Sequence, residues 1–268
     1  MAKEQFFIAA SQVIVDLFDR ASNQTGLSRG QVFDDFLTLS RCALAGQSME
    51  EEYLATVGKG YARGKEGSRG IDTITEAFAQ LVIAMDETGD DILGDIFTGA
   101  ITYGEHGQFF TPDSVCALMS ALSLPVDRTD EPKTVCDPAC GSGRMLLSVA
   151  KQQPHWEFTG QDVDHRAAQM TAINLGLHGL RGWAVWQNTL TLECHRVYKI
   201  GFNQFGGVIR EIPFEQSPFH YEAIAAQPIS TISIKSVSQV KATEQDVDGP
   251  FNIEPPQNDP STSQLDLF

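Results

Sequence analysis

The sequence predicts a doubly wound α/β domain that follows an all-helical domain. Apolar residues recur at helical spacing through the first hundred or so residues. After Pro132, short apolar runs alternate with helical segments in the order strand, helix, strand, helix, which is the pattern of a parallel sheet. A hydrophobic fraction of 42% over 268 residues is enough for a substantial core, and excludes fibrous and fully disordered chains.

The amino-terminal part contains five helical patterns. Gly26 separates the first two, and Gly58 and Gly60 end the third. Ser48, with Glu51 three residues later, predicts a capping box at the start of this third helix. The predicted helices span residues 6–18, 32–44, 48–61, 72–85 and 90–97.

The α/β part begins with a short apolar strand and ends in a polar tail. Strands are predicted at 134–137, 156–160, 184–186 and 207–212, with helices at 144–150 and 165–177. Residues 230–240 are rich in β-branched side chains and form a further candidate strand. Residues 242–268 are polar, acidic and proline-bearing, so we expect a mostly disordered tail.

Charge limits the partners that the chain can bind alone. Nineteen Lys and Arg against 35 Asp and Glu give a net charge of -16. Such an acidic chain should not bind bare nucleic acid unless a local cationic face or a partner supplies positive charge. The five cysteines are scattered without paired spacing and the six histidines show no ligand spacing, so buried free thiols and no metal site are expected.

No segment of the sequence indicates a membrane or an export route. Every apolar run is interrupted well before the roughly 20 residues that a membrane helix needs. The amino terminus lacks the pattern of a signal peptide. We therefore expect a cytoplasmic protein.

A glycine-bearing loop between the strand at 134–137 and the next helix is the strongest candidate site. Glycines let the backbone turn tightly and approach a ligand, and the helix amino terminus adds backbone donors. Asp162 follows the next strand about 20 residues later, where a ribose-binding carboxylate belongs. The loop comprises Asp137, Pro138, Ala139, Cys140, Gly141, Ser142 and Gly143, and together with Asp162 it favours a nucleoside ligand.

The stretch from Asp91 to Leu192 resembles the N6-adenine DNA methyltransferases, specifically the modification subunits of type I restriction systems. The resemblance implies a Rossmann-like S-adenosylmethionine-dependent methyltransferase sheet, in which the loop 137–143 holds the methionine moiety of the cofactor and Asp162 binds the ribose. Asn188 stands where the family often has an acidic residue that contacts the cofactor adenine. Upstream, the family element that packs over the cofactor is matched by Gln108, Phe109, Phe110, Thr111 and Pro112.

The implied domain layout has three parts. A helical domain covers residues 1–105, a methyltransferase-like domain covers 106–241, and the acidic tail covers 242–268.

The sequence departs from the family where adenine is held. Amino-methylation of adenine uses an Asn/Asp-Pro-Pro-Tyr/Phe tetrapeptide, whose acceptors bind the amino group and whose ring stacks on the flipped base. This tetrapeptide does not occur in the sequence. The positional candidate is the segment 211–214, with Glu211, Pro213 and Phe214 as catalytic candidates, although Glu carries its carboxylate one methylene further out.

Three functions remain open at this point. The first is methyl transfer from S-adenosylmethionine to adenine N6 in DNA. The second is a catalytically inactive homologue that acts as a binding module, and the third is a methyltransferase for a protein or small molecule. Type I modification subunits carry further sheet and helices after the tetrapeptide, and we expect no counterpart of these elements here. We therefore expect DNA recognition through another subunit, such as a specificity subunit.

The last five residues resemble the pentapeptide with which bacterial replication and repair proteins dock on the sliding clamp. Leucine and phenylalanine side chains can fill an apolar groove while the glutamine fixes register. The alternative is a strand or helix end that packs back onto the domain. The residues concerned are Gln264, Leu265, Asp266, Leu267 and Phe268.

Overall fold

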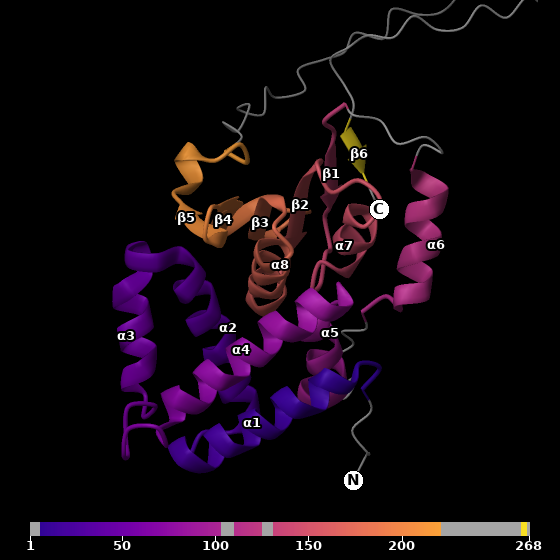
Figure 1. Cartoon of the computed structure of the whole chain (residues 1–268). Helices are drawn as coiled ribbons and strands as arrows, with labels where there is room; N and C mark the ends of the chain where they lie inside the picture. Colours follow the sequence, from indigo (N-terminus) through magenta and orange to yellow (C-terminus); the bar gives the residue numbers. More distant parts are fainter. Residues whose placement is uncertain (1–5, 103–109, 125–130, 221–263, 267–268) are drawn as a thin grey trace, which may run out of the picture.

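The computed structural model describes residues 6–102, 110–124, 131–220 and 264–266 (Figure 1). Gln108, Phe109, Leu267 and Phe268 lie outside these ranges, as does the candidate strand at 230–240. Among the described helices, none is long and apolar enough to cross a membrane.

The amino-terminal part is helical, as the periodicity predicts. Its core is aromatic: the Phe18 ring lies 4.9 Å from that of Phe36 and 6.0 Å from that of Phe33, measured between ring centroids. Helix α1 packs against α4, and α5 continues into a π-helical segment, η2. The elements are α1 (Ala9–Thr25), α2 (Arg29–Ala45), η1 (Gly46–Met49), α3 (Glu50–Gly58), α4 (Gly70–Thr88), α5 (Ile92–Ile96) and η2 (Phe97–Thr102).

The capping box forms at a different helix from the one predicted. Ser28 accepts a hydrogen bond from the Gln31 backbone N–H, and the Gln31 side chain accepts one from the Ser28 N–H, at the start of α2. Ser48 instead lies in the 3-10 turn η1, and its hydroxyl donates to the Ala45 carbonyl. The prediction at Ser48 is wrong because the chain enters α3 through this turn.

The sheet has six strands in the order β5-β4-β3-β2-β1-β6. Strands β1, β2 and β3 are parallel, as predicted, but β4 and β5 continue the sheet in antiparallel fashion. The strand-helix alternation thus predicts the parallel part of the sheet, whereas the short β3–β4 and β4–β5 loops cannot hold a crossover helix and give antiparallel pairs. The strands are β1 (Thr134–Asp137), β2 (Glu157–Asp162), β3 (Arg181–Asn188), β4 (Glu193–Asn203), β5 (Gly206–Ile212) and β6 (Gln264–Asp266).

Helices cover one face of this sheet and join it to the helical part. Helix α8 (His165–Leu177) lies on β2 to β5, and α2 packs against both α8 and β5 (Figure 1). Phe33 of α2, Leu175 of α8 and Phe158 of β2 belong to one cluster of buried side chains. The helical part and the sheet therefore share a continuous hydrophobic core.

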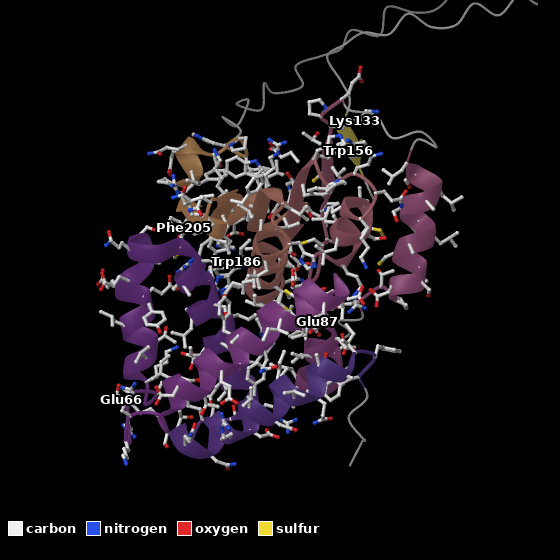
Figure 2. All side chains as sticks on the ribbon, viewed as in Figure 1. Glu66, Glu87, Lys133, Trp156, Trp186 and Phe205 are labelled. Carbon is white, nitrogen blue, oxygen red and sulfur yellow. The ribbon has the colours of Figure 1, made fainter. Side chains whose placement is uncertain are left out.

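The opposite face has a smaller apolar cluster. It consists of Val185, Val197 and Phe219, with the Trp183 ring edge-on to Phe219 at 5.7 Å. At the amino-terminal ends of the strands, Lys133 lies over Trp156, with its Nζ atom 5.6 Å from the ring centroid (Figure 2). A 3-10 turn, η4 (Phe214–Gln216), follows β5.

Two further helices come directly before and after β1 in the sequence. Helix α7 (Arg144–Ala150) follows the glycine loop with the predicted bounds, and α6 (Asp113–Ser123), which the periodicity analysis did not include, packs against it. The hydroxyls of Ser120 and Ser148 lie 2.8 Å apart across this contact.

The end of the chain returns to the sheet. Residues Gln264–Asp266 form β6, which pairs in parallel with β1 in the register Thr134 to Gln264. The backbone of these three residues thus adopts the packed-back arrangement that the sequence left as an alternative. Residues 242–263 of the expected disordered tail lie outside the described ranges.

Candidate functional site

The glycine loop turns at the carboxyl end of β1 and is fastened to the end of β2. The Gly141 N–H donates to Asp162 Oδ2 over 2.9 Å, and the Cys140 N–H donates to the Gln161 carbonyl over 2.9 Å. The other Asp162 oxygen accepts from the Asp164 N–H, also at 2.9 Å. The structure therefore brings the loop and Asp162 together at adjacent strand ends, as the sequence pattern predicts.

Two features require glycine at position 141: its backbone angle φ and its close contact with a neighbouring side chain. Its φ is +55°, a left-handed conformation that side chains disfavour. A Cβ atom there would lie 2.8 Å from the Phe110 ring. The Phe110 ring is itself stacked on Phe97, with ring centroids 5.4 Å apart and planes at 17°. Phe110 is thus packed directly over the loop.

A pocket of about 380 Å³ opens beside this loop. Phe110 and Thr111 contribute from the upstream element, whereas Gln108 and Phe109 lie outside the described residues. Pro112 is the residue before α6 and acts as its N-cap. The lining side chains come from three stretches: Phe110, Thr111, Val115, Cys116 and Met119; Asp137, Ala139, Cys140, Gly141 and Ser142; and Arg144 with Met145.

One buried carboxyl group, Asp137, and one half-buried carboxyl group, Asp162, give this site its electrostatic character. Burial raises the pKa of Asp137 to about 6, against a lowering contribution from the Ala139 N–H that donates to it. Burial also raises the pKa of Asp162, although backbone donors from Asp164 and Gly141 act in the opposite direction. Within the described residues, Asp137 forms no ion pair. A ligand that brings a cation or hydroxyl donors would supply the missing partner.

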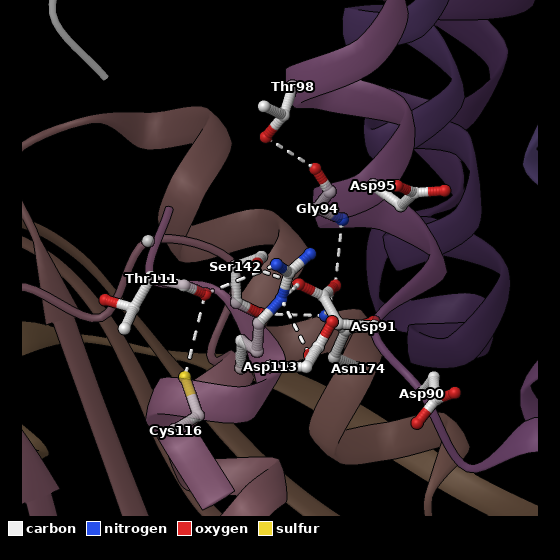
Figure 3. Close-up of polar contacts among 12 residues, drawn as sticks. Asp90, Asp91, Gly94, Asp95, Thr98, Thr111, Asp113, Cys116, Ser142 and Asn174 are labelled. Atoms are coloured by element: carbon white, nitrogen blue, oxygen red, sulfur yellow. Dashed lines mark hydrogen bonds and ion pairs between the residues drawn. The ribbon is translucent and has the colours of Figure 1, made fainter. Parts of the chain in front are cut away.

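A buried polar network ties the loop to the helical part (Figure 3). Asp91, whose side chain is 1% exposed, accepts hydrogen bonds from the Ser142 hydroxyl, from Asn174 Nδ2 at 2.8 Å and from the Gly94 N–H at 2.8 Å. Asn174 also donates to the Ser142 carbonyl over 2.7 Å. A Cβ atom on Gly94 would lie 2.0 Å from Asp91 Oδ2, so this contact demands glycine.

Arg144 joins the same network to the start of α6. Its Nε atom lies 3.0 Å from Asp91 Oδ2 and 3.3 Å from Asp113 Oδ1. Its Nη1 atom donates to the Thr111 carbonyl over 3.3 Å. Sequence reasoning missed Asp91, Asp113 and Arg144 as site residues. The position of Arg144 directly after the loop, and of Asp91 before an apolar helix, were the signals in the sequence.

Asn188 ends β3 and does not line the pocket. Its side-chain oxygen accepts from the Leu190 and Thr191 N–H groups, at 3.0 and 3.2 Å, and so shapes the loop to β4. Beside it on β3, the Trp186 ring is stacked between His165 and His195, with centroid distances of 4.3 and 4.5 Å.

Glu211, Pro213 and Phe214 lie away from the pocket. Glu211 is on β5, four strands from β1, which corresponds to about 19 Å at ~4.8 Å per strand. Its carboxylate pairs with Arg196 at 3.3 Å and with Arg41 at 3.8 Å. Phe214 packs against the small cluster of Val185 and Val197. The structure therefore does not bring these three candidates to the glycine loop.

A glycine loop after β1 and an acidic residue after β2 define the Rossmann-like class of nucleotide-binding proteins. Residues 88–242, more than half of the chain, match the family model described as N-6 DNA Methylase. The chain therefore belongs to this family. The cofactor that this membership assigns to it is S-adenosylmethionine.

Curated relatives are methylase subunits of greater length. The chain is 34% identical over 102 residues to the type I restriction enzyme MjaVIII methylase subunit of Methanocaldococcus jannaschii, a match that covers 35% of this chain and 17% of the relative. It is 24% identical over 206 residues to the type I restriction enzyme MpnII methylase subunit of Mycoplasma pneumoniae, covering 67% of this chain and 37% of the relative. The matches thus span well under half the length of either relative.

Solved structures with a similar chain course have low TM-scores. One, assigned as a class I S-adenosylmethionine-dependent methyltransferase from Listeria monocytogenes, gives a TM-score of 0.39 at 16% identity, covering 65% of this chain and 51% of that chain. Another, a type I restriction-modification methyltransferase subunit from Streptococcus thermophilus, gives 0.34 at 17% identity, covering 63% and 56%.

Proposed function

We propose that this chain binds S-adenosylmethionine in the pocket beside the glycine loop and serves as the cofactor-binding part of an adenine-N6 DNA methylation system. The observation that carries the proposal is the meeting of the loop and Asp162, through the 2.9 Å hydrogen bond from Gly141. The relatives named as type I methylase subunits make DNA the proposed substrate and a specificity subunit a proposed partner.

The residues present fit this cofactor. Asp162 lies beside the loop but is not among the residues that line the pocket; its carboxylate accepts backbone N–H groups from Gly141 and Asp164 and has further lone pairs for the ribose hydroxyls. Asp137 offers a buried carboxyl group to an ammonium group, and the Phe110 ring closes the pocket over the loop. A volume of about 380 Å³ lies within the range of small-molecule sites. When bound, the cofactor supplies the methyl group.

The residues that would hold adenine have less support than those that would bind the cofactor. The sequence lacks the Asn/Asp-Pro-Pro-aromatic tetrapeptide, and the Glu211 carboxylate is held in two ion pairs. These observations favour a binding module that depends on a partner subunit for DNA and for base positioning. Methyl transfer by the chain alone, with Glu211, Pro213 and Phe214 at the base, is the second candidate.

Calorimetric titration of the full chain with S-adenosylmethionine tests the proposal. We expect saturable binding, and a loss of affinity of at least about tenfold for Asp162→Ala, because two hydroxyl contacts to a charged acceptor are removed. Asp164→Asn is the matched control, since it removes a neighbouring carboxylate while keeping the acceptor that caps α8, and its affinity should stay within about twofold of the parent. Absence of binding by the parent chain would overturn the proposal.

A methyl-transfer assay on the same sample separates the two candidates. Labelled methyl transfer to mixed-sequence DNA by the chain alone would favour the enzyme. Binding without transfer, restored by an added specificity subunit or methylase partner, would favour the cofactor-binding module. Binding that no partner converts into transfer would favour the inactive homologue.

We also propose that the final pentapeptide docks on the sliding clamp. The support is the match of residues 264–268 to the docking sequence. In the structure, the backbone of Gln264–Asp266 is hydrogen-bonded to β1 as strand β6. Docking in a groove therefore requires that β6 leave the sheet edge.

A further inference from the structure

Among the described residues that line the pocket, Arg144 is the single cationic side chain. Arg144 follows the glycine loop directly, and its side chain is 11% exposed. S-adenosylmethionine carries both an ammonium and a carboxylate on its methionine moiety. Asp137 is suited to the ammonium, which leaves the carboxylate in need of a cation.

We infer that Arg144 binds the methionine carboxylate of S-adenosylmethionine. This inference rests on the proposed function and names a residue for one group of the ligand. The Nε–H and one Nη1–H of Arg144 are used by Asp91 and Thr111. The hydrogen bonds that Arg144 makes with the described residues use Nε and Nη1, so its Nη2 atom is left to donate to a carboxylate oxygen.

Asp91 is the positioning residue for this guanidinium. The Asp91 carboxylate accepts hydrogen bonds from the Ser142 hydroxyl, Asn174 and the Gly94 N–H, so its position is fixed independently of Arg144. Its contact with Nε, together with the Thr111 carbonyl on Nη1, fixes the plane of the guanidinium and leaves Nη2 for a ligand. A guanidinium held in a fixed plane loses little conformational freedom when it binds a carboxylate.

Asp113 competes with the ligand for the same cation. It lies 3.3 Å from Arg144 Nε, but its side chain is 56% exposed and stands in the first turn of α6. It can therefore turn toward water when another carboxylate arrives. Because like charges repel, removing the charge of Asp113 should strengthen binding of the cofactor carboxylate.

Two ligands distinguish carboxylate binding from a structural role. The probes are S-adenosylmethionine and its decarboxylated analogue, titrated into the full chain by calorimetry. We expect Arg144→Gln to lower the affinity for S-adenosylmethionine at least about tenfold while leaving the affinity for the analogue within about twofold. Asp113→Asn should raise the affinity for S-adenosylmethionine and not that for the analogue.

The outcomes separate this inference from the proposed function. If the parent chain binds neither ligand, the proposed function fails. If it binds both and Arg144→Gln weakens both equally, or neither, the assignment of Arg144 is overturned. Should Arg144→Gln fail to fold, the ratio of the two affinities in Asp113→Asn decides, since an unchanged ratio contradicts the inference.

Discussion

The carboxyl group of Asp137 is buried at the carboxyl end of β1, where a ligand could reach it. Burial raises its pKa to about 6 from an ordinary value near 4. A buried carboxylate without a cation is unfavourable for the free protein, but it becomes favourable once a cationic ligand pairs with it. This residue therefore favours ligand binding at a cost to the stability of the free chain.

Asp137→Asn should make the free protein more stable at neutral pH. The folded chain holds the Asp137 proton more tightly than the unfolded chain, so the parent loses stability as pH rises from about 4 to about 6 and stays less stable above. The expected gain for Asn is about 1–3 kcal/mol at pH 7 and close to zero at pH 4. Denaturant unfolding at both pH values measures this difference. An equal effect at the two pH values would contradict the raised pKa.

At the scale of elements, the antiparallel hairpin of β4 and β5 is joined to the helical part by buried charge. Arg41 of α2 is fully buried, and its Nη2 atom lies 2.7 Å from Glu52 of α3. The same guanidinium lies over the Tyr198 ring of β4 at 5.0 Å, and 3.8 Å from Glu211 of β5. The Arg41 side chain on α2 thus contacts three other elements, and Glu211 is one partner in this cluster of contacts.

Arg41→Met should destabilise the fold by about 1–3 kcal/mol, because half-buried Glu52 loses its 2.7 Å partner while Arg196 still pairs with Glu52 and Glu211. Arg20→Ala is the matched control: Arg20 pairs with Glu76 on the surface, with side chains 48% and 51% exposed, so the loss should stay below about 1 kcal/mol. Urea unfolding of the two variants measures the contrast. Similar losses in the free energy of unfolding of the two variants would contradict a stabilising role of the contacts of Arg41.

At the scale of the whole molecule, the helical part and one face of the sheet share one core. Side chains from α1, α2, α8 and strands β1 to β5 belong to a single buried cluster. The glycine loop is part of this arrangement through Asp91, and residues 264–266 join the sheet as β6. We expect docking of the tail on a clamp to require release of β6, because residues of the proposed docking sequence are paired with β1.

Deleting residues 264–268 should abolish capture of the full chain by purified, surface-bound sliding clamp. The matched control replaces Pro255 and Pro256 by alanine in the same tail, outside the pentapeptide, and should bind as the parent does. Surface plasmon resonance measures both. Equal binding by the shortened chain would refute clamp docking, whereas loss of binding in the proline variant would place the contact elsewhere in the tail.

The secondary structure of the segment from β1 to α8 could be predicted from short stretches of the sequence. The glycine loop, the bounds of α7 and α8 and the position of Asp162 agree with the prediction, because turns and apolar periodicity are encoded within a few neighbouring residues. The family follows from the same stretch. Helix α6 and strand β4 were not predicted, although Pro112 directly before α6 and the apolar residues at helical spacing within it were signals for the helix.

Only the tertiary structure decided which distant residues meet. Arg144 reaches Asp91 across 53 positions of sequence, and Arg41 reaches Glu211 through the packing of α2 on β5. Strand order and the reversal at β4 likewise depend on loop lengths and on which face is buried. The periodicity of apolar residues predicts that a face is buried but not what it packs against. The polar network around the pocket could therefore not be predicted from the sequence.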